Sequence, residues 1–193
     1  MRYEKGRKDA SRRKIIEVAS ERFRSDGIAA TGLATIMGDA GMTNGAFYPH
    51  FQSKADLVRE SVAAAADAQA DEIRQMIGEG GVERAIAAYL SPEHRDNPGQ
   101  GCTFAALLPE LARQPLETRI VYAERFAALA REWASALPQH VEDPDAVAMS
   151  VYATLIGTLQ LARAVEGTEL SDRILAAGAD AARALVQNGS AGR

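Results

Sequence analysis

Apolar residues recur at helical spacing along nearly the whole chain, and polar or glycine-rich breaks separate the apolar runs into about nine helices. Helices are predicted at residues 10–26, 33–40, 44–50, 54–77, 82–90, 102–113, 116–137, 144–166 and 171–188. Two apolar stripes on 116–137 predict a helix buried between others, and turn formers predict a loop at 91–101. The chain is rich in alanine and has no alternating β-branched run. The predicted fold class is therefore all-α.

Residues 33–43 predict a short helix followed by a tight turn. The apolar residues of this helix share one face, at Leu33, Ile36, Met37 and Ala40. Gly41 stands where a left-handed residue ends a helix at little cost. Thr43 is expected to cap the next helix with its hydroxyl.

The next predicted helix, residues 44–50, is roughly 10 Å long at about 1.5 Å per residue. Phe47 and Phe51 lie four residues apart and would anchor it to the core. The side chains left facing outward are Asn44, Tyr48 and His50. This layout is typical of a helix-turn-helix that inserts its second helix into a major groove about 12 Å wide. Two ordinary packed helices are the alternative interpretation.

The segment resembles the DNA-binding domain of the tetracycline-repressor (TetR) family. The family pattern is matched at Thr31, Ile36, Ala40, Gly41, Thr43, Gly45, Phe47, Tyr48, His50, Phe51 and Lys54. The resemblance covers roughly residues 10–60 by motif, and the rest of the chain agrees only in length and helical character. Two residues depart from the pattern. Met37 replaces the usual alanine, and Pro49 removes a backbone donor inside the second helix and disfavours a helical Tyr48.

The resemblance implies two kinds of DNA contact. Phosphate contacts that fix the register are implied for Thr31, Tyr48, His50 and Lys54. Base-edge contacts are implied for Thr43, Asn44 and the bare backbone of Gly45. An asparagine can pair bidentately with adenine, a discrimination worth about 1–3 kcal/mol. A packing or capping role for His50 and a solvated surface position for Lys54 are the alternatives.

Charge is distributed unevenly along the chain. The net charge is −4, which alone argues weakly against nucleic acid. The first 60 residues hold 11 Lys and Arg against 8 Asp and Glu, whereas the rest hold 11 against 18. Seven of the cations lie in residues 1–14, at Arg2, Lys5, Arg7, Lys8, Arg12, Arg13 and Lys14. These residues predict a basic arm that neutralises DNA phosphates and is a solvated, disordered tail without DNA.

Composition limits the other function classes. The single cysteine excludes an intramolecular disulfide framework and suits a reducing cytosol. The charged N-terminus carries no secretory signal. A cytoplasmic protein is therefore expected. Residues 146–165 come nearest to a membrane span, but their polar residues favour a buried interface helix and no membrane partner. No phosphate-binding glycine motif and no Cys/His metal spacing is present, so no cofactor, metal or enzymatic activity is expected. An enzyme or a helical interaction module remains a remote alternative.

The chain is expected to divide into two functional parts. Residues 1–53 would form the DNA-binding domain with its basic arm, and residues 54–193 a helical ligand-binding and dimerisation domain. The last two helices, capped by Asp143 and Ser171, combine large aliphatic residues with Ala and Gly and predict self-association. The resemblance implies a homodimer through these two helices. Such a dimer would read a near-palindromic operator in double-stranded DNA.

A pocket for a small-molecule inducer of unknown identity is expected in the second part. The candidate lining residues are Cys102, Phe104, Tyr122, Phe126, Trp133 and Tyr152. Core packing is the alternative for each aromatic residue. Cys102 opens a helix, whose dipole favours a thiolate. Some repressors of the resembled family sense electrophiles or oxidants through a cysteine. The alternative is that Cys102 is a small buried apolar residue without a sensing role. The chain is thus predicted to be a ligand-responsive repressor, with an activator on the same scaffold as the alternative.

Overall fold

The computed structural model describes the backbone of residues 2–189 and the side chains of residues 6–189. The α-helices in this part are α1 (Arg2–Asp26), α2 (Leu33–Asp39), α3 (Lys54–Tyr89), α4 (Pro92–Asp96), α5 (Thr103–Leu111), α6 (Leu116–Ser135), α7 (Pro144–Ala164) and α8 (Glu169–Asn188). Two 3-10 turns are present, η1 (Asn44–Ala46) and η2 (Pro98–Gln100). Across residues 2–189 every regular element is helical, which confirms the all-α prediction with eight α-helices in place of about nine.

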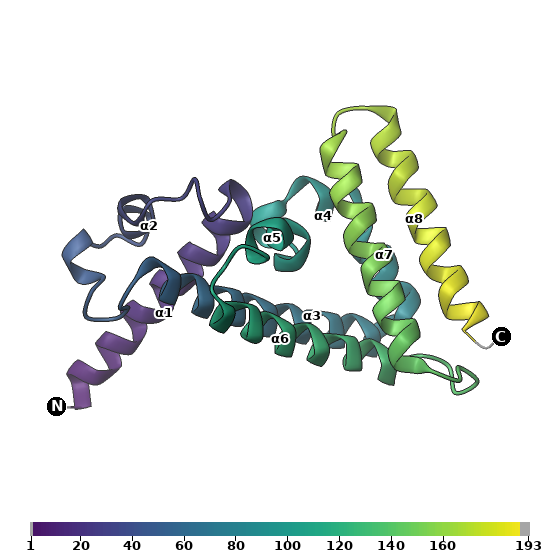
Figure 1. Cartoon of the computed structure of the whole chain (residues 1–193), viewed down its shortest axis with the longest axis horizontal. Helices are drawn as coiled ribbons and strands as arrows, with labels where there is room; N and C mark the ends of the chain where they lie inside the picture. Colours follow the sequence, from purple (N-terminus) through teal and green to yellow (C-terminus); the bar gives the residue numbers. More distant parts are fainter. Residues whose placement is uncertain (1, 190–193) are drawn as a thin grey trace.

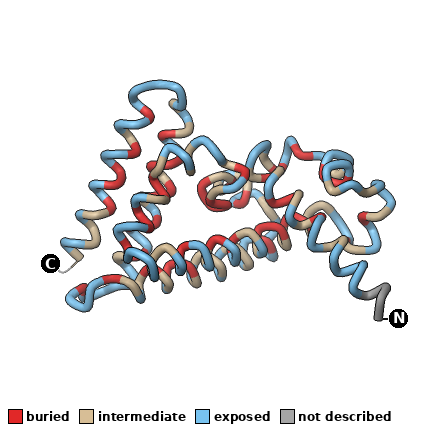
Figure 2. Tube along the Cα trace, turned by 180° about the vertical axis from the view of Figure 1, so that it is seen from behind, coloured by how far each residue is buried: buried red, intermediate tan, exposed pale blue. Residues whose placement is uncertain are grey.

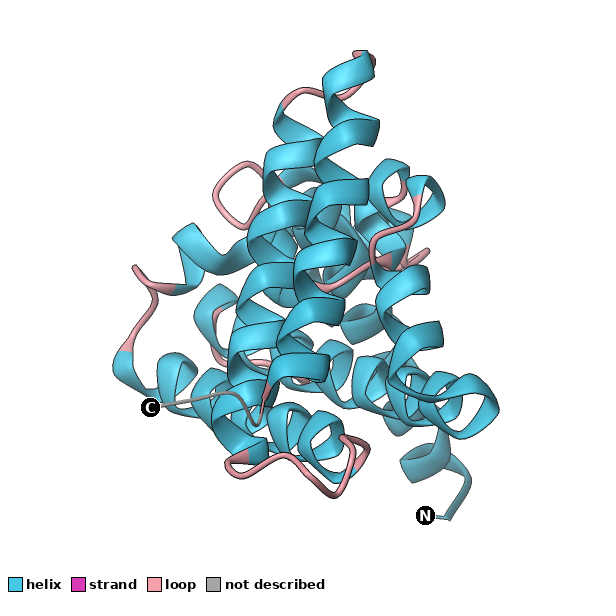
Figure 3. Cartoon of the chain, turned by 90° about the vertical axis from the view of Figure 1, so that its right-hand side faces the viewer, coloured by secondary structure: helices cyan, strands magenta, loops and turns pink. Residues whose placement is uncertain are grey.

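The elements form an elongated molecule with its two ends built differently (Figure 1). The helices α3 and α6 run side by side along its length, with α5 above them near the middle. The antiparallel pair α7 and α8 lies at the C-terminal end, seen face-on in Figure 3. The N-terminal elements α1 and α2 lie at the opposite end. Buried positions line the inward faces of these helices (Figure 2).

Two clusters of buried side chains hold the molecule together. The first joins α1, α2 and the segment around Phe47 and Phe51 to the start of α3, and it includes Leu107 and Leu111 of α5. The second joins the rest of α3 to α5, α6, α7 and α8 around Trp133. Each large apolar side chain that is fully buried stabilises the fold by about 1.5–3 kcal/mol. Because α5 contributes to both clusters, the N-terminal elements pack directly against the rest of the chain.

Helix ends and breaks follow local sequence signals. Gly27 and Gly41 have φ of 86° and 72°, the left-handed conformation, directly after α1 and just beyond α2. Gly80 and Gly81 are non-helical inside α3, so the predicted break between residues 77 and 82 is confirmed. The side chain of Asp143 caps α7, as predicted, and that of Ser53 caps α3.

Several predicted boundaries are wrong. The helix α1 already begins at Arg2, so the basic residues extend a helix instead of forming a separate arm; the side chains of Arg2 and Lys5 lie outside the described residues. The predicted loop 91–101 contains α4 and η2, because Ser91 caps α4 and Pro92 suits its first turn. The cap of α8 is Thr168, since the Ser171 hydroxyl donates to the carbonyl of Ala162 at 2.8 Å.

The burial of α6 and α7 also differs from a simple apolar pattern. One predicted stripe of α6 is only partly in the core: Leu116 and Ile120 at its start are 59% and 48% exposed, whereas Leu137 at its end is 9% exposed. The other stripe is buried at Leu129 and Trp133. Among the described residues, α7 alone is long and apolar enough to meet a membrane-span criterion. Its residues Val151 and Leu155 are fully buried in the second cluster, which agrees with a buried helix.

Candidate DNA interface and effector cavity

The outward-facing part of the predicted helix-turn-helix is a run of tight turns, here called the recognition segment, residues 43–51. Its only regular element is η1, and beyond it the amides of His50 and Phe51 donate to the carbonyl of Phe47 at 2.9 and 3.1 Å. The predicted continuous helix over 44–50 is therefore wrong. Pro49 has no N–H to donate, so an α-helix at this position would lack one hydrogen bond of its ladder.

The predicted side-chain cap of this segment is also absent. Thr43 occupies the N-cap position with extended backbone angles, but its hydroxyl makes no capping hydrogen bond. The amide of Ala46 donates to the carbonyl of Thr43 at 3.0 Å. In so tight a turn this donor is already satisfied, and the hydroxyl of Thr43 stays exposed and free for another partner.

Exposure along the recognition segment separates anchoring from outward-facing residues. Phe47 and Phe51 are each 1% exposed, and their rings stack with centroids 5.4 Å apart. The exposed residues between and before them are Thr43, Asn44, Gly45 and Tyr48, of which Tyr48 is 71% exposed. The exposure of Asn44 and Tyr48 agrees with the prediction from spacing, whereas His50, also predicted to face outward, is half-buried. The contacts of these residues with DNA stay predictions.

Thr31 and Lys54 both hold the turn between α1 and α2. The Thr31 hydroxyl donates to the carbonyl of Gly27 at 2.7 Å, and Lys54 Nζ donates to the carbonyl of Ile28 at 2.5 Å. Thr31 is 2% exposed, so this geometry does not support the phosphate contact predicted for its hydroxyl. Lys54 is half-buried and uses one of its three N–H donors here, which leaves two for a phosphate.

Positive charge from α1 lies next to the recognition segment. The Arg12 guanidinium lies over the ring of Phe51 at 5.1 Å from its centroid and pairs with Glu60 of α3. The pKa of His50 is lowered by partial burial and then by the charges of Lys8 and Arg12. The Nδ1 atom of His50 is buried without a hydrogen-bond partner among the described residues. Lys8 and Arg12 of α1 therefore lie next to the recognition segment.

Two side-chain links across the molecule were not predicted from the sequence. Glu110 of α5 accepts hydrogen bonds from the backbone amides of Ile28 and Ala29 at 3.1 and 2.9 Å. Arg24 of α1 donates to the carbonyl of Gly99 in η2 at 2.8 Å. Both links join residues at least 75 positions apart, so no local pattern could reveal them.

The aromatic residues predicted to line a pocket pack mainly against one another. Phe104, Trp133 and Tyr152 are fully buried, and Phe104 meets Tyr122 edge to face at 4.9 Å. Edge-to-face contact is a favoured way for rings to fill a core. These three and the half-buried Tyr122 and Phe126 therefore form core, which corrects the prediction that they line the pocket.

A cavity of about 590 Å³, here called the main cavity, lies beside this aromatic core. It is bounded by both halves of α3, by α4, and by the connecting segment, residues 97–101, up to Cys102. Cys102 is the one predicted pocket residue that lines it. Gln69, Ile73, Met76, Tyr89 and His94 contribute to its wall. Across residues 6–189 no cluster of His, Cys, Asp or Glu could hold a metal ion.

Cys102 lies in a chain of polar contacts at the wall of the main cavity. Its Sγ lies 3.3 Å from the hydroxyl of Tyr152 and accepts from the amide of Ala105 at 3.4 Å. Gln69 Nε2 donates to the same Tyr152 hydroxyl at 3.2 Å. The pKa of the Tyr152 hydroxyl is raised well above its ordinary value by burial and by the nearby Cys102. The tyrosine therefore stays protonated and can donate to the sulfur.

His94 joins α4 to the start of α5. Its Nδ1 lies 2.7 Å from the carbonyl of Tyr89, and its Nε2 lies 2.9 Å from the amide of Cys102. A carbonyl only accepts and an amide only donates, so the proton is on Nδ1 and Nε2 is the acceptor. Burial lowers the pKa of His94, which favours this neutral form.

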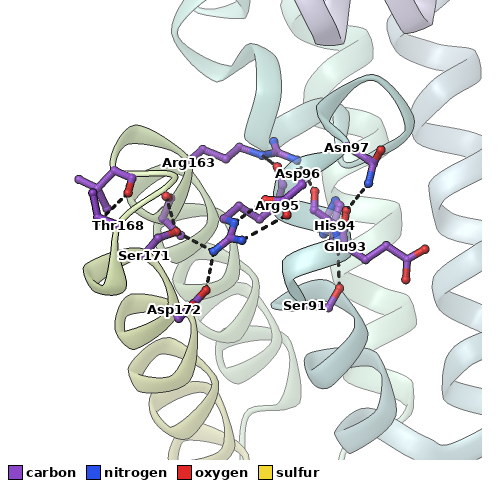
Figure 4. Close-up of polar contacts among 12 residues, drawn as sticks. Ser91, Glu93, His94, Arg95, Asp96, Asn97, Arg163, Thr168, Ser171 and Asp172 are labelled. Carbon is purple, nitrogen blue, oxygen red and sulfur yellow. Dashed lines mark hydrogen bonds and ion pairs between the residues drawn. The ribbon is translucent and has the colours of Figure 1, made fainter.

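Arginines fix α4 to the C-terminal helices (Figure 4). Arg95 Nη1 donates to Ser171 and Asp172 of α8 at 2.9 and 2.6 Å. Arg163 of α7 donates to the carbonyls of His94 and Arg95 at 2.7 and 3.0 Å. One side of the main cavity is therefore tied to the helix pair α7 and α8.

The chain is similar to known proteins both in sequence and in fold. The sequence model of the bacterial regulatory proteins of the tetR family matches residues 15–61. The HTH-type transcriptional regulator TtgR of Pseudomonas putida is 49% identical over 49 residues, 25% of this chain and 23% of TtgR. The probable HTH-type transcriptional regulator ArpR of the same species matches equally. The chain thus spans about a quarter of the length of these curated relatives.

Solved structures match over most of the chain. The reduced form of NemR from E. coli has a TM-score of 0.69 at 20% identity, covering 88% of this chain and 95% of NemR. A TetR-family regulator from Cytophaga hutchinsonii has a TM-score of 0.76 at 17% identity, covering 94% and 96%. At these identities the likeness concerns the fold.

Proposed function

This chain belongs to the TetR family of bacterial regulatory proteins, and on that premise we propose that it is a cytoplasmic repressor released from a palindromic operator by a small-molecule inducer. The observation that carries the proposal is the recognition segment. Its outer residues are exposed, while Phe47 and Phe51 fix it from beneath. Base contacts by Thr43, Asn44 and Gly45 would select sequence, and phosphate contacts by Tyr48, His50 and Lys54 would fix position.

We propose that the protein acts as a homodimer through α7 and α8. Met149 and Leu161 of α7 and Leu170 of α8 are 46%, 61% and 49% exposed in the protomer. A groove of about 500 Å³ between the two helices is lined largely by alanine and other small residues, which allow close approach of a second helix pair. A twofold dimer carries two recognition segments, which accounts for a palindromic operator.

Release would follow from a ligand that distinguishes two arrangements of the dimer. A ligand in the main cavity can shift the equilibrium only by its difference in affinity between the DNA-binding arrangement and the released one. An activator built on the same scaffold is the alternative. A reporter gene placed behind a bound promoter separates the two, because deletion of a repressor raises expression and deletion of an activator lowers it.

A reactive inducer is a second candidate, favoured by the position of Cys102. Its sulfur belongs to the wall of the main cavity, and the Tyr152 hydroxyl lies 3.3 Å from it. As an electrophilic alkene in the cavity forms a carbon–sulfur bond with Cys102, the thiol would lose its proton to solvent, and the displaced π electron pair would take up a proton from solvent. Cys102→Ser should abolish release by electrophiles or oxidants while release by non-reactive inducers persists. Normal release by every electrophile and oxidant tested would exclude this role.

The repressor proposal is tested by selecting genomic DNA fragments with the purified protein. Wild type should enrich a palindromic sequence, and Asn44→Ala should lose selectivity at one position of each half-site by about 1–3 kcal/mol. Lys54→Ala should weaken all fragments alike. Gln139→Ala, which removes an exposed amide between α6 and α7, is the control and should leave selection unchanged.

Salt dependence supplies a further measurement on the same samples. A protein with about six phosphate contacts loses on the order of a thousandfold in affinity between about 50 and 200 mM salt. Failure to retain any fragment at low salt without inducer would overturn the repressor proposal. Unchanged sequence preference in Asn44→Ala would overturn the assignment of the base contact.

A further inference from the structure

The wall of the main cavity carries an uneven distribution of charge. Glu72 of α3 and Glu93 of α4 line it from two different elements. Among the described residues that line it there is no lysine or arginine. The pKa of His94, the histidine in the wall, is lowered by burial and then by the charge of Arg163, which favours the neutral imidazole. The cavity therefore presents negative charge without a lining cation to offset it.

Two guanidinium groups lie near the main cavity and donate to backbone carbonyls, and Nη1 of Arg163 is buried without a hydrogen-bond partner among the described residues. Arg24 donates to the carbonyl of Gly99, and Arg163 donates to the carbonyls of His94 and Arg95. Neither arginine belongs to the lining. Arg24 interacts electrostatically with Glu72 from the α1 side, so it reduces the field of that carboxylate without contacting a molecule in the cavity.

Two buried polar atoms of the wall have no hydrogen-bond partner among the described residues. They are Oε1 of Gln69 and the hydroxyl of Tyr89, in residues that are 8% and 5% exposed. An unpaired buried polar group costs about 1–3 kcal/mol, which a complementary ligand recovers. Because Gln69 Nε2 already donates to Tyr152, the free atom is the amide oxygen. This oxygen only accepts, so it calls for an N–H or O–H group on the ligand.

The rest of the wall suits an apolar body. Ile73, Met76, Ala85 and Ala88 line the main cavity. The flexible thioether of Met76 adapts to ring systems of different outline. A volume of about 590 Å³ is in the range of cavities that enclose drug-sized molecules.

We infer that the main cavity binds an amphipathic organic cation. Its apolar ring system packs against Ile73 and Met76, an N–H group donates to Gln69 Oε1, and its positive charge faces Glu72 and Glu93. Carboxylates and phosphates of the same size are rejected, because two like charges meet them at the wall. The inference rests on the proposed function in that this cation is the inducer.

Three molecules that share one ring system test the charge preference. At neutral pH 9-aminoacridine is a cation with N–H donors, acridine is neutral and acridine-9-carboxylate is an anion. Each is titrated at low salt into the full-length protein without DNA, and binding is followed by calorimetry. The cation should bind at least about tenfold more tightly than the anion, a difference of about 1.4 kcal/mol. This preference should shrink as salt is added.

Matched variants locate the binding site. Glu72→Gln and Glu93→Gln should each weaken 9-aminoacridine by about threefold and leave acridine unchanged, because a partly exposed ion pair contributes little by itself. Glu79→Gln removes the same charge from α3 outside the main cavity and is the control. Gln69→Leu should weaken 9-aminoacridine but not acridine, which has no N–H to donate. Glu72 and Glu93 are exposed, so their glutamine variants should stay folded. They therefore measure binding even if Gln69→Leu does not fold.

The outcomes separate this inference from the repressor proposal. An anion that binds as tightly as the cation, or glutamine variants that behave like Glu79→Gln, would overturn the ligand class. The same preparation is tested for retention of genomic DNA fragments. Protein that retains DNA but prefers the anion contradicts only the ligand class. Protein that prefers the cation but retains no DNA contradicts only the repressor proposal.

Discussion

Glu110 is the carboxylate that ties the N-terminal elements to α5, and its removal has a calculable effect on stability. It accepts from the backbone amides of Ile28 and Ala29 at 3.1 and 2.9 Å. Ala29 is exposed, so water replaces the carboxylate there at little cost in Glu110→Ala. Ile28 is 6% exposed, and its amide would be left unpaired. An unsatisfied buried donor costs about 1–3 kcal/mol, so the free energy of unfolding should fall by about 2 kcal/mol.

Urea unfolding followed by circular dichroism measures this change. Protein concentration is held fixed, because the stability of the proposed dimer would depend on it. Glu110→Gln keeps one acceptor oxygen for Ile28 and should lose about half as much as alanine. Glu142→Ala removes an exposed carboxylate from the loop before α7 and is the control. A Glu110→Ala protein within about 0.5 kcal/mol of wild type, the usual range for surface changes, would refute the reasoning that this carboxylate holds the turn.

Three further predictions follow from single contacts. Folding stability should fall as pH drops below about 6.5, the ordinary pKa of histidine. Burial lowers the pKa of His94 in the folded protein, so in this range the unfolded chain binds a proton that the folded chain does not, and protonation favours unfolding. His94→Asn should flatten this part of the pH profile in urea unfolding. In thermal unfolding, Gly178→Ala should lower the free energy of unfolding by about 1–3 kcal/mol, because its Cβ would lie 2.2 Å from Thr158. The Cβ of Gly157→Ala meets nothing within 4 Å in the protomer, so this variant should stabilise α7 by about 0.4–1 kcal/mol. Leu161→Glu should shift sedimentation from dimer to monomer without loss of helix content, because Leu161 is 61% exposed on α7.

Local signals in the sequence were sufficient for the helices and most of their ends. Glycines in the left-handed conformation end α1 and α2, and the pair Gly80 and Gly81 interrupts α3 as predicted. The Ser91-Pro92 pair is likewise a start signal, and it could have identified α4 inside the segment interpreted as a loop. Within the recognition segment, the regular turn η1 is shorter than the predicted helix because the missing donor at Pro49 affects the whole segment and not one hydrogen bond alone.

The cavity wall could not be found in this way, because it depends on tertiary packing. Aromatic residue type predicts burial but not whether a ring faces a core or a cavity, so Phe104 and Trp133 were assigned to the wrong place. The actual wall includes Gln69 and Tyr89 of the same helix. They meet across the non-helical residues at Gly80 and Gly81, which redirect the second half of α3. The sequence predicts the break itself, but the direction of the second half of α3 after it, which shapes the cavity, is set by tertiary packing.

The connecting segment, residues 97–101, joins the wall of the main cavity to α1, so it would couple the proposed ligand binding to the N-terminal elements. Gln100 and Gly101 line the main cavity, while Gly99 accepts from Arg24 of α1 at 2.8 Å. Gly99 packs so closely on α1 that a Cβ there would lie 2.4 Å from the Ser25 hydroxyl. A hydrogen bond to a charged group contributes about 1.5–3 kcal/mol. A ligand that favours an arrangement without the Arg24–Gly99 hydrogen bond would therefore release α1 from the connecting segment. The energy involved is in the usual range of allosteric coupling, about 1–3 kcal/mol. Because Lys8 and Arg12 of α1 lie next to the recognition segment, an energy of this size would weaken the proposed DNA contact about tenfold.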